Sequence, residues 1–170
     1  MKILEKLAEL WSGIGYPFLI HKGDELRFSE IASQSQVDLS DVRKGDVVAI
    51  IGDFNPWSIL TLLRLIDIGV IVLPLTVETR HEHGYFFESA LVDVVIDGTE
   101  VKRRSHGQKH EFIEKLRELS HAGLVLFSTG TTGRPKAILH DLTLFLKRFE
   151  TPRPTLRKIN FLLFDHIGGI

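Results

Sequence analysis

The sequence contains no cysteine, and methionine, tyrosine and tryptophan are scarce among its 170 residues. Without cysteine the chain cannot form a disulfide framework, use a thiolate nucleophile or bind zinc through sulfur, and such a chain suits a reducing compartment. It also lacks any run of about 18 apolar residues, the length that a membrane-spanning helix needs, and Glu5 and Glu9 interrupt the first apolar stretch. We therefore expect a cytoplasmic protein with no membrane span.

An excess of charge of either sign is also missing, because 21 basic residues stand against 22 acidic residues and the formal net charge is −1. A chain with no strong overall field is not steered towards nucleic acid or an anionic membrane. We therefore predict no nucleic-acid partner. Basic residues do gather at 102–104 and in the segment 148–158, and we interpret both groups as solvated loop surface.

Apolar residues are abundant, at 44% of the chain, and suffice for one compact domain with a buried core. Their spacing predicts a helix over residues 3–11, followed by two short strands at 17–20 and 25–28 and a weak helix at 29–36. The apolar run 47–51 predicts a buried strand. Asn55 and Pro56 then introduce a helix over 57–66, which Gly69 ends before a strand at 70–73.

Strands and helices continue to alternate in the second half of the chain. We expect helices at 79–89 and 112–119, strands at 92–96, 124–127 and 137–139, and a charged loop after residue 96. A helix capped by Asp141, a turn at 152–154 and a strand at 159–164 complete the expected elements. This alternation predicts an α/β fold over residues 1–170 as a single domain, with a layered, largely parallel sheet flanked by helices.

A glycine loop with phosphate-binding chemistry follows the apolar run 124–127, where residues 128–136 read STGTTGRPK. Glycines let backbone amides point into a concave nest, hydroxyls donate hydrogen bonds, and a lysine places positive charge on phosphate oxygens. The residues that supply these groups are Ser128, Thr129, Gly130, Thr131, Thr132, Gly133 and Lys136. A polar surface turn has the same composition, so the residues alone leave that alternative open.

A Walker loop also joins a strand to glycines and a lysine, but its spacing is different. That motif needs GxxxxGK followed by Ser or Thr, whereas Arg134 and Pro135 separate Gly133 from Lys136, and Ala137 comes next. Pro135 also resists the helix that a Walker loop enters. We therefore exclude a Walker loop.

The run is similar to the signature loop of the adenylate-forming superfamily, which includes acyl-CoA synthetases, luciferases and peptide-synthetase adenylation domains and is usually written SGTTG-x-PK-G. Nine consecutive residues fit almost position by position. Two features depart from the pattern. Ser128 and Thr129 stand where Thr-Ser is commoner, and Ala137 replaces a glycine, which limits backbone freedom just after Lys136.

Three other segments resemble the same family in the same order. Residues 45–51 resemble its first core strand, Asn55 and Pro56 with the stretch 69–75 resemble its "GxxxxPL" region, and residues 164–169 resemble its "FHxxG" substrate motif. The resemblance spans residues 1–170. It implies the N-terminal subdomain of the adenylate-forming synthetase fold, truncated after Ile170.

In this family a carboxylate attacks the α-phosphate of ATP to give an acyl-adenylate and pyrophosphate, and a thiol then takes the acyl group. Catalysis of this kind depends on positioning and on neutralising phosphate charge, usually with Mg²⁺. The resemblance implies an ATP-dependent carboxylic acid–CoA ligase with ATP, Mg²⁺ and CoA or a carrier-protein thiol as partners. It assigns residues 128–133 and Lys136 to the β- and γ-phosphates, and His166 to a catalytic place near the substrate carboxylate.

Residues 1–170 contain no counterpart of the family's adenine-stacking segment, ribose-binding Asp, hinge or C-terminal catalytic Lys. We therefore expect this polypeptide by itself to form no acyl-adenylate. A parallel sheet cut after the strand at 159–164 should leave an edge or an apolar face uncovered, so we also expect self-association.

Three alternatives remain. Peptide-synthetase adenylation domains carry an Asp after a Phe in the region of Asp165, where it pairs with the α-ammonium of the substrate, and a buried carboxylate needs such a partner. The following His-Ile-Gly-Gly is more similar to the acyl-CoA branch, so amino-acid activation ranks second. The other two alternatives are a non-catalytic nucleotide- or polyphosphate-binding module and a plain α/β interaction domain in which the glycine loop is only a surface turn.

Histidines occur in two close pairs, His81 with His83 and His106 with His110. No motif around them supplies a complete set of metal ligands. We therefore predict no metal site and interpret these histidines as solvated helix or loop positions.

Overall fold

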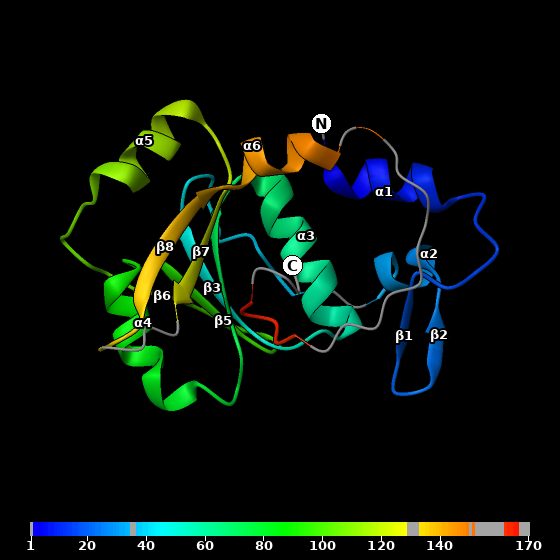
Figure 1. Ribbon diagram of the computed structural model, residues 1–170, viewed down its shortest axis with the longest axis horizontal. Helices are drawn as coiled ribbons and strands as arrows, with labels where there is room; N and C mark the ends of the chain where they lie inside the picture. The colour runs from blue at the N-terminus through cyan, green and yellow to red at the C-terminus, as the bar shows by residue number, and fades with distance from the viewer. Residues whose placement is uncertain (1, 35–36, 129–132, 150, 152–161, 167–170) are drawn as a thin grey trace.

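The computed structural model describes residues 2–34, 37–128, 133–149, 151 and 162–166. Its first part comprises the helix α1 (Ile3–Trp11), the antiparallel hairpin of β1 (Leu19–His21) and β2 (Asp24–Leu26), and the short helix α2 (Phe28–Ala32). The hairpin and α2 lie to one side of the main sheet (Figure 1). The side chain of Asp67 accepts hydrogen bonds from the amides of Ile3 and Leu4 at 2.5 and 3.2 Å, which attaches the start of α1 to the rest of the chain.

The main sheet has six strands among the described residues, in the order β6-β5-β3-β4-β7-β8. The four central strands run parallel, and the two outer strands run antiparallel to their neighbours. The strands are β3 (Val47–Ile51), β4 (Ile71–Leu75), β5 (Val94–Asp97), β6 (Glu100–Arg103), β7 (Gly123–Ser128) and β8 (Lys136–Asp141). The prediction of a layered, largely parallel sheet is confirmed.

The unit β3-α3-β4 forms because its local signals agree with one another. The side chain of Asn55 accepts a hydrogen bond from the amide of Ser58 at 2.9 Å, and Pro56 opens α3 (Pro56–Ile68) where no intrahelical donor is needed. Gly69 ends the helix with a φ of 83°, a conformation that glycine adopts without strain. The five residues of β3 are all buried, as expected of a strand covered on both faces.

Helices cover both faces of the sheet. Leu62 and Leu65 of α3 pack with Val48, Ile50 and other side chains of one face. The opposite face packs against α4 (His83–Ser89) and α5 (Glu111–Leu119), and α6 (Leu142–Leu146) lies against β7. In Figure 1, α3 lies to the right of the labelled strands, and α4 and α5 lie at the left of the view. Alternate residues of each central strand therefore point into separate cores.

Residues 102–104 are exposed, as the sequence predicted, but Lys102 and Arg103 lie in a strand and not in a loop. Residues 100–103 form β6, which pairs with β5 so that Asp97 faces Glu100 and a two-residue turn begins at Gly98, whose φ is 59°. Arg103 forms an ion pair with Asp46 at 2.6 Å. Gly98, between the segments that form β5 and β6, is a sequence signal for a hairpin. The three consecutive basic residues 102–104 led to the interpretation of this segment as a loop instead.

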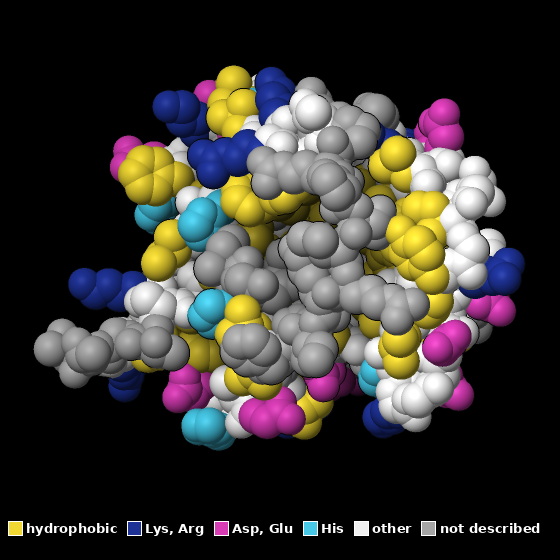
Figure 2. All heavy atoms as spheres, turned by 45° about the vertical axis from the view of Figure 1, so that its right-hand side comes forward, with side chains coloured by type: hydrophobic (Ala, Val, Ile, Leu, Met, Phe, Trp, Pro, Cys, Tyr) yellow, Lys and Arg dark blue, Asp and Glu magenta, His cyan; other side chains and the backbone are white. Residues whose placement is uncertain are grey.

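Two other element predictions need correction. The helix expected at 79–89 begins at His83, after a short 3-10 turn at Arg80–Glu82. Of the strand expected at 159–164 only residues 162–164 are described, and these are not in a strand. The chain turns here, and the amide of His166 donates a hydrogen bond to the carbonyl of Leu163. The turn expected at 152–154 lies outside the described residues. Within the described part of the chain, no helix is long and apolar enough to span a membrane. Acidic and basic side chains both occur among apolar ones on the face that Figure 2 shows.

Candidate functional site

The carboxyl ends of β3, β4, β5 and β7 lie together at one edge of the main sheet, because these four strands are parallel. Open sheets of this kind bind ligands outside the carboxyl ends of their strands. Thr76 follows β4, Asp97 ends β5, and Ser128 ends β7. The candidate site is therefore at this edge.

The glycine loop joins β7 to β8, and its two stems face each other across the strand pair. Ser128 and Lys136 are opposite in the register, and the amide of Lys136 donates a hydrogen bond to Oγ of Ser128 at 3.3 Å. Gly133 is exposed, and nothing lies within 4 Å of where a Cβ would stand. The remaining predicted residues, 129–132, lie outside the described residues. The structure thus brings Ser128 and Lys136 together and leaves Lys136 exposed.

The turn 164–166 lies at the same edge. Phe164 is completely buried and packs edge to face on Phe54, with ring centroids 5.3 Å apart, so the turn is held by the core on the α3 side of the sheet. His166 follows with an exposed side chain, and its amide donates to the carbonyl of Leu163 at 3.0 Å. The structure therefore places His166 next to the carboxyl edge without showing a contact with Ser128 or Lys136.

The Asp165 carboxyl is half-buried, and this burial raises its pKa. The negative charge of Glu78 raises it further, whereas His166 and a hydrogen bond with Thr76 act in the opposite direction. Thr76 is itself buried and comes directly after β4. Asp165 therefore lies near Thr76 at the carboxyl end of β4. Its burial disfavours the charged form, and a bound cation would favour it.

His83 is the functional-site candidate that the sequence did not reveal. It is only 4% exposed, which corrects its interpretation as a solvated position. Its Nε2 lies 2.9 Å from the carbonyl oxygen of Thr76 and 3.3 Å from Oγ1 of Thr79. Burial lowers the pKa of His83, which favours the neutral ring. Nothing in the local sequence distinguishes it from its exposed neighbour His81.

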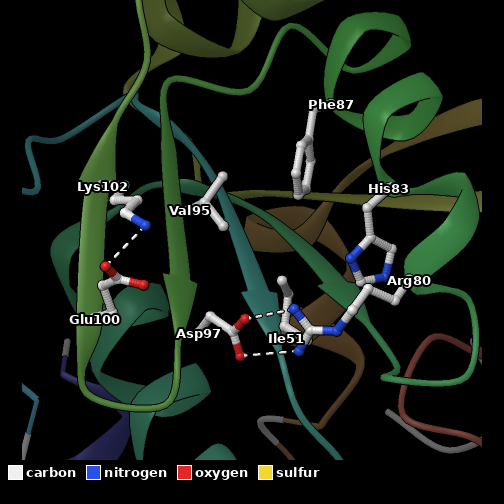
Figure 3. Close-up of a pocket in the computed structure, with 8 residues that line it drawn as sticks. All are labelled: Ile51, Arg80, His83, Phe87, Val95, Asp97, Glu100 and Lys102. Carbon is white, nitrogen blue, oxygen red and sulfur yellow. Dashed lines mark hydrogen bonds and ion pairs between the residues drawn. The ribbon is translucent and has the colours of Figure 1, made fainter.

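A pocket of about 240 Å³ adjoins His83 on the α4 side of the sheet (Figure 3). Its apolar wall is made by Ile51, Phe87 and Val95, and two ion pairs flank it. Figure 3 shows Arg80 pointing to Asp97, a contact of 2.7 Å, and Lys102 pointing to Glu100, a contact of 2.8 Å. Because its charged groups pair with one another, the pocket presents little unbalanced charge to a ligand.

His106 and His110, the second close pair of histidines in the sequence, both contact other residues of the protein. Nε2 of His106 lies 3.0 Å from a carboxylate oxygen of Asp93, and the side chain of His110 accepts a hydrogen bond from the amide of Phe112 at the start of α5. Among the described residues, no group of three or more histidines and carboxylates is arranged to hold a metal ion.

No family model matches this chain, and a search of curated proteins finds no match either. Solved structures do match. The o-succinylbenzoate CoA synthetase MenE of Bacillus subtilis, in complex with the acyl-adenylate intermediate OSB-AMP, has a TM-score of 0.63 at 19% identity, covering 98% of this chain and 50% of that chain. The N-terminal subdomain of Klebsiella oxytoca NpsA, in complex with anthranilyl-AMSN, has a TM-score of 0.59 at 20% identity, covering 89% and 43%.

A third match is NpsA-ThdA of Klebsiella oxytoca, an artificially fused adenylation and carrier-protein di-domain, with a TM-score of 0.56 at 21% identity over 80% of this chain and 31% of that chain. These neighbours are adenylate-forming enzymes or their N-terminal subdomains. The chain has the mixed α/β fold of that subdomain and spans half or less of the length of these proteins.

Proposed function

We propose that this chain is the phosphate-binding part of an enzyme that activates a carboxylic acid as an acyl-adenylate with ATP and passes the acyl group to a thiol. The observation that carries the proposal is the pairing of Ser128 with Lys136 across β7 and β8, at the carboxyl edge of a parallel sheet. This pairing closes the base of a loop whose sequence resembles the signature of adenylate-forming enzymes. The fold, which is that of their N-terminal subdomain, supports the same conclusion.

Within the proposed site the glycine loop binds the β- and γ-phosphates of ATP. Lys136 supplies positive charge from an exposed position at the start of β8, and Ser128 supplies a hydroxyl from the end of β7. The proposal adds Thr129, Gly130, Thr131, Thr132 and Gly133 from the resemblance. Mg²⁺ would accompany the nucleotide and neutralise part of its charge.

We propose that the acid lies beside the turn 164–166, with His166 near its carboxylate. The thiol is CoA in the leading form of the proposal, in which the parent enzyme is an acid–CoA ligase. MenE is named as a CoA synthetase, whereas NpsA is fused to a carrier protein in its di-domain structure, so the neighbours support both kinds of acceptor.

Amino-acid activation is the second candidate, and Asp165 is the observation that favours it. Its raised pKa reflects a half-buried carboxyl whose charge is poorly compensated. The α-ammonium of an amino acid would compensate that charge. A stable aminoacyl-adenylate analogue should then raise the melting temperature of the protein more than the matching analogue without the amino group, and Asp165→Asn should abolish the difference.

Titration calorimetry with ATP and Mg²⁺ tests the phosphate-binding role. Hydrogen bonds to charged groups contribute about 1.5 to 3 kcal/mol, so Lys136→Ala should weaken ATP binding by roughly one to two orders of magnitude. Lys115→Ala is the matched control, because Lys115 is an exposed lysine on α5. Equal binding by the Lys136 variant and the wild-type chain would contradict the proposal.

A further inference from the structure

The helix α4 contacts both stems of the glycine loop. On the β7 side, the ring of Phe86 stacks on Phe127, the residue before Ser128, with ring centroids 4.1 Å apart. On the β8 side, the hydroxyl of Tyr85 donates a hydrogen bond to the carbonyl oxygen of Pro135 at 2.8 Å. Two neighbouring residues of one helix thus hold the two points where the loop leaves and re-enters the sheet.

The hydrogen bond from Tyr85 restrains Pro135, which is not paired within the sheet. Proline has no amide hydrogen, so its carbonyl is the only backbone group that can form a hydrogen bond. Pro135 also lies outside β8, which begins at Lys136. The Tyr85 hydroxyl therefore supplies a restraint that the strand ladder cannot.

Tyr85 also holds the residue before Pro135. The guanidinium of Arg134 lies over the Tyr85 ring, 5.3 Å from its centroid, which is within the range of a cation–π contact. Consecutive residues of the loop stem are thus attached to one side chain, Arg134 through the ring face and Pro135 through the hydroxyl. The next residue is Lys136.

We propose that Tyr85 is a positioning residue for phosphate binding: by fixing Arg134 and Pro135 it sets the point at which the chain enters β8 and hence the place of the Lys136 side chain. This inference rests on the proposed function of the loop. Its physical basis is preorganisation, because a group already held in its binding position loses less freedom when the ligand arrives. If the Lys136 ammonium is displaced from this position, its interaction with the phosphate becomes weaker.

Tyr85→Phe isolates the hydroxyl. The variant keeps the ring and can therefore keep its contacts with Arg134 and with Phe127, whose ring centroid is 6.2 Å away. Tyr16→Phe is the matched control, because it removes a tyrosine hydroxyl from the first part of the chain, where Tyr16 packs edge to face on Trp11 at 5.9 Å. The two variants delete the same atom at different distances from the loop.

Two measurements on the full chain test the inference: titration calorimetry with inorganic tripolyphosphate and with ATP plus Mg²⁺, and amide hydrogen exchange over residues 136–138. We expect Tyr85→Phe to weaken binding of both ligands by roughly three- to tenfold, as the loss of one hydrogen bond predicts. Exchange at residues 136–138 should become severalfold faster in the absence of ligand. Tyr16→Phe should change neither quantity.

The outcomes separate this inference from the proposed function. If the wild-type chain binds neither ligand, the proposed function fails and the role of Tyr85 fails with it. If the wild-type chain binds and Tyr85→Phe binds equally well, the role of Tyr85 alone is overturned, whatever the exchange rates show. Weaker binding without faster exchange would also overturn it, because the hydroxyl would then act on the ligand rather than on the loop.

Discussion

Nε2 of His83 lies 2.9 Å from the carbonyl oxygen of Thr76, which connects the first residue of α4 to the residue that follows β4. A ring nitrogen in this position donates its proton to the carbonyl, which leaves Nδ1 as the acceptor nitrogen of the neutral ring. His83 also lines the pocket beside β5, and Thr76 is near enough to Asp165 to lower the pKa of its carboxyl. The hydrogen bond between His83 and Thr76 therefore lies between the pocket and the turn that contains Asp165.

The first prediction concerns pH. Burial lowers the pKa of His83 and Arg80 lowers it further, whereas the hydrogen bond to Thr76 and the charges of Asp97 and Asp165 oppose the shift. The folded protein therefore binds this proton less readily than the unfolded chain, whose histidine has a pKa near 6.5. The stability contributed by the neutral ring is complete above that value and is lost as the pH falls below it.

Urea unfolding at about pH 7.5 and about pH 5.5 should show this loss as a lower free energy of unfolding in acid. His83→Gln replaces the ring with an amide that can donate to Thr76 but does not titrate, so the decline should be smaller in that variant. His81→Gln is the control, because the His81 side chain is 76% exposed. An equal decline in the wild-type chain and the His83 variant would exclude His83 as the cause.

The second prediction concerns Gly123, where β7 begins beside β4. A Cβ at this position would lie 2.9 Å from carbon atoms of both Ile71 and Leu116. Gly123→Ala should therefore lower the free energy of unfolding by about 1 to 3 kcal/mol through overpacking. Gly107→Ala has open space around its Cβ and should change it little. Similar urea midpoints for the two variants would show that β7 can shift without cost.

The third prediction concerns Asp93, which lies just before β5 at the amino end of the parallel strands. Its carboxylate accepts hydrogen bonds from the amide of Val47 at 2.8 Å and from Arg117 at 3.0 Å, and it also contacts His106. The Asp93 side chain is only 18% exposed, so these contacts are poorly screened by solvent. Asp93→Ala should cost about 2 to 3 kcal/mol of unfolding free energy.

Glu100→Ala is the contrasting variant. Glu100 pairs with Lys102 at 2.8 Å, but both side chains are about two-thirds exposed, at 60% and 67%. Exposed ion pairs contribute at most about 1 kcal/mol. Chemical unfolding should be measured in low and in high salt. The Asp93 variant should show a large decrease in the free energy of unfolding that depends little on salt, and the Glu100 variant should show a small decrease. A loss of the same size in both would contradict the special role of Asp93.

A fourth prediction tests the start of α3. Asn55→Ala removes the side-chain acceptor for the amide of Ser58 and should lower the free energy of unfolding by about 1 kcal/mol. Asn55→Asp retains an acceptor at the same place and should stay close to the wild type in a urea titration. If both substitutions are equally harmful, the amide group of Asn55 has another role.

Much of the fold follows from signals that lie close together in the sequence. Asn55 and Pro56 introduce α3, Gly69 ends it, and the apolar runs on either side become β3 and β4. The side chain of Asp141 caps α6 by accepting from the amide of Leu144, as its sequence position predicts. Propensities and caps act within a few residues, so a sequence reports them directly.

The same is true of the glycine loop as a candidate phosphate site. Its hydroxyls, glycines and lysine occupy nine consecutive residues, and the antiparallel pairing of the adjacent strands β7 and β8 brings Ser128 and Lys136 together. The family resemblance rests on this run.

Tertiary structure decided which side chains hold these parts in place. Tyr85 and Pro135 are fifty residues apart, and their contact exists because the helix after β4 packs over the neighbouring β7 and β8. His83 is buried, whereas His81, two residues earlier, is exposed. Sequence specifies locally which residues form a strand or a helix, but burial and partners depend on strand order, which arises only when distant segments pack.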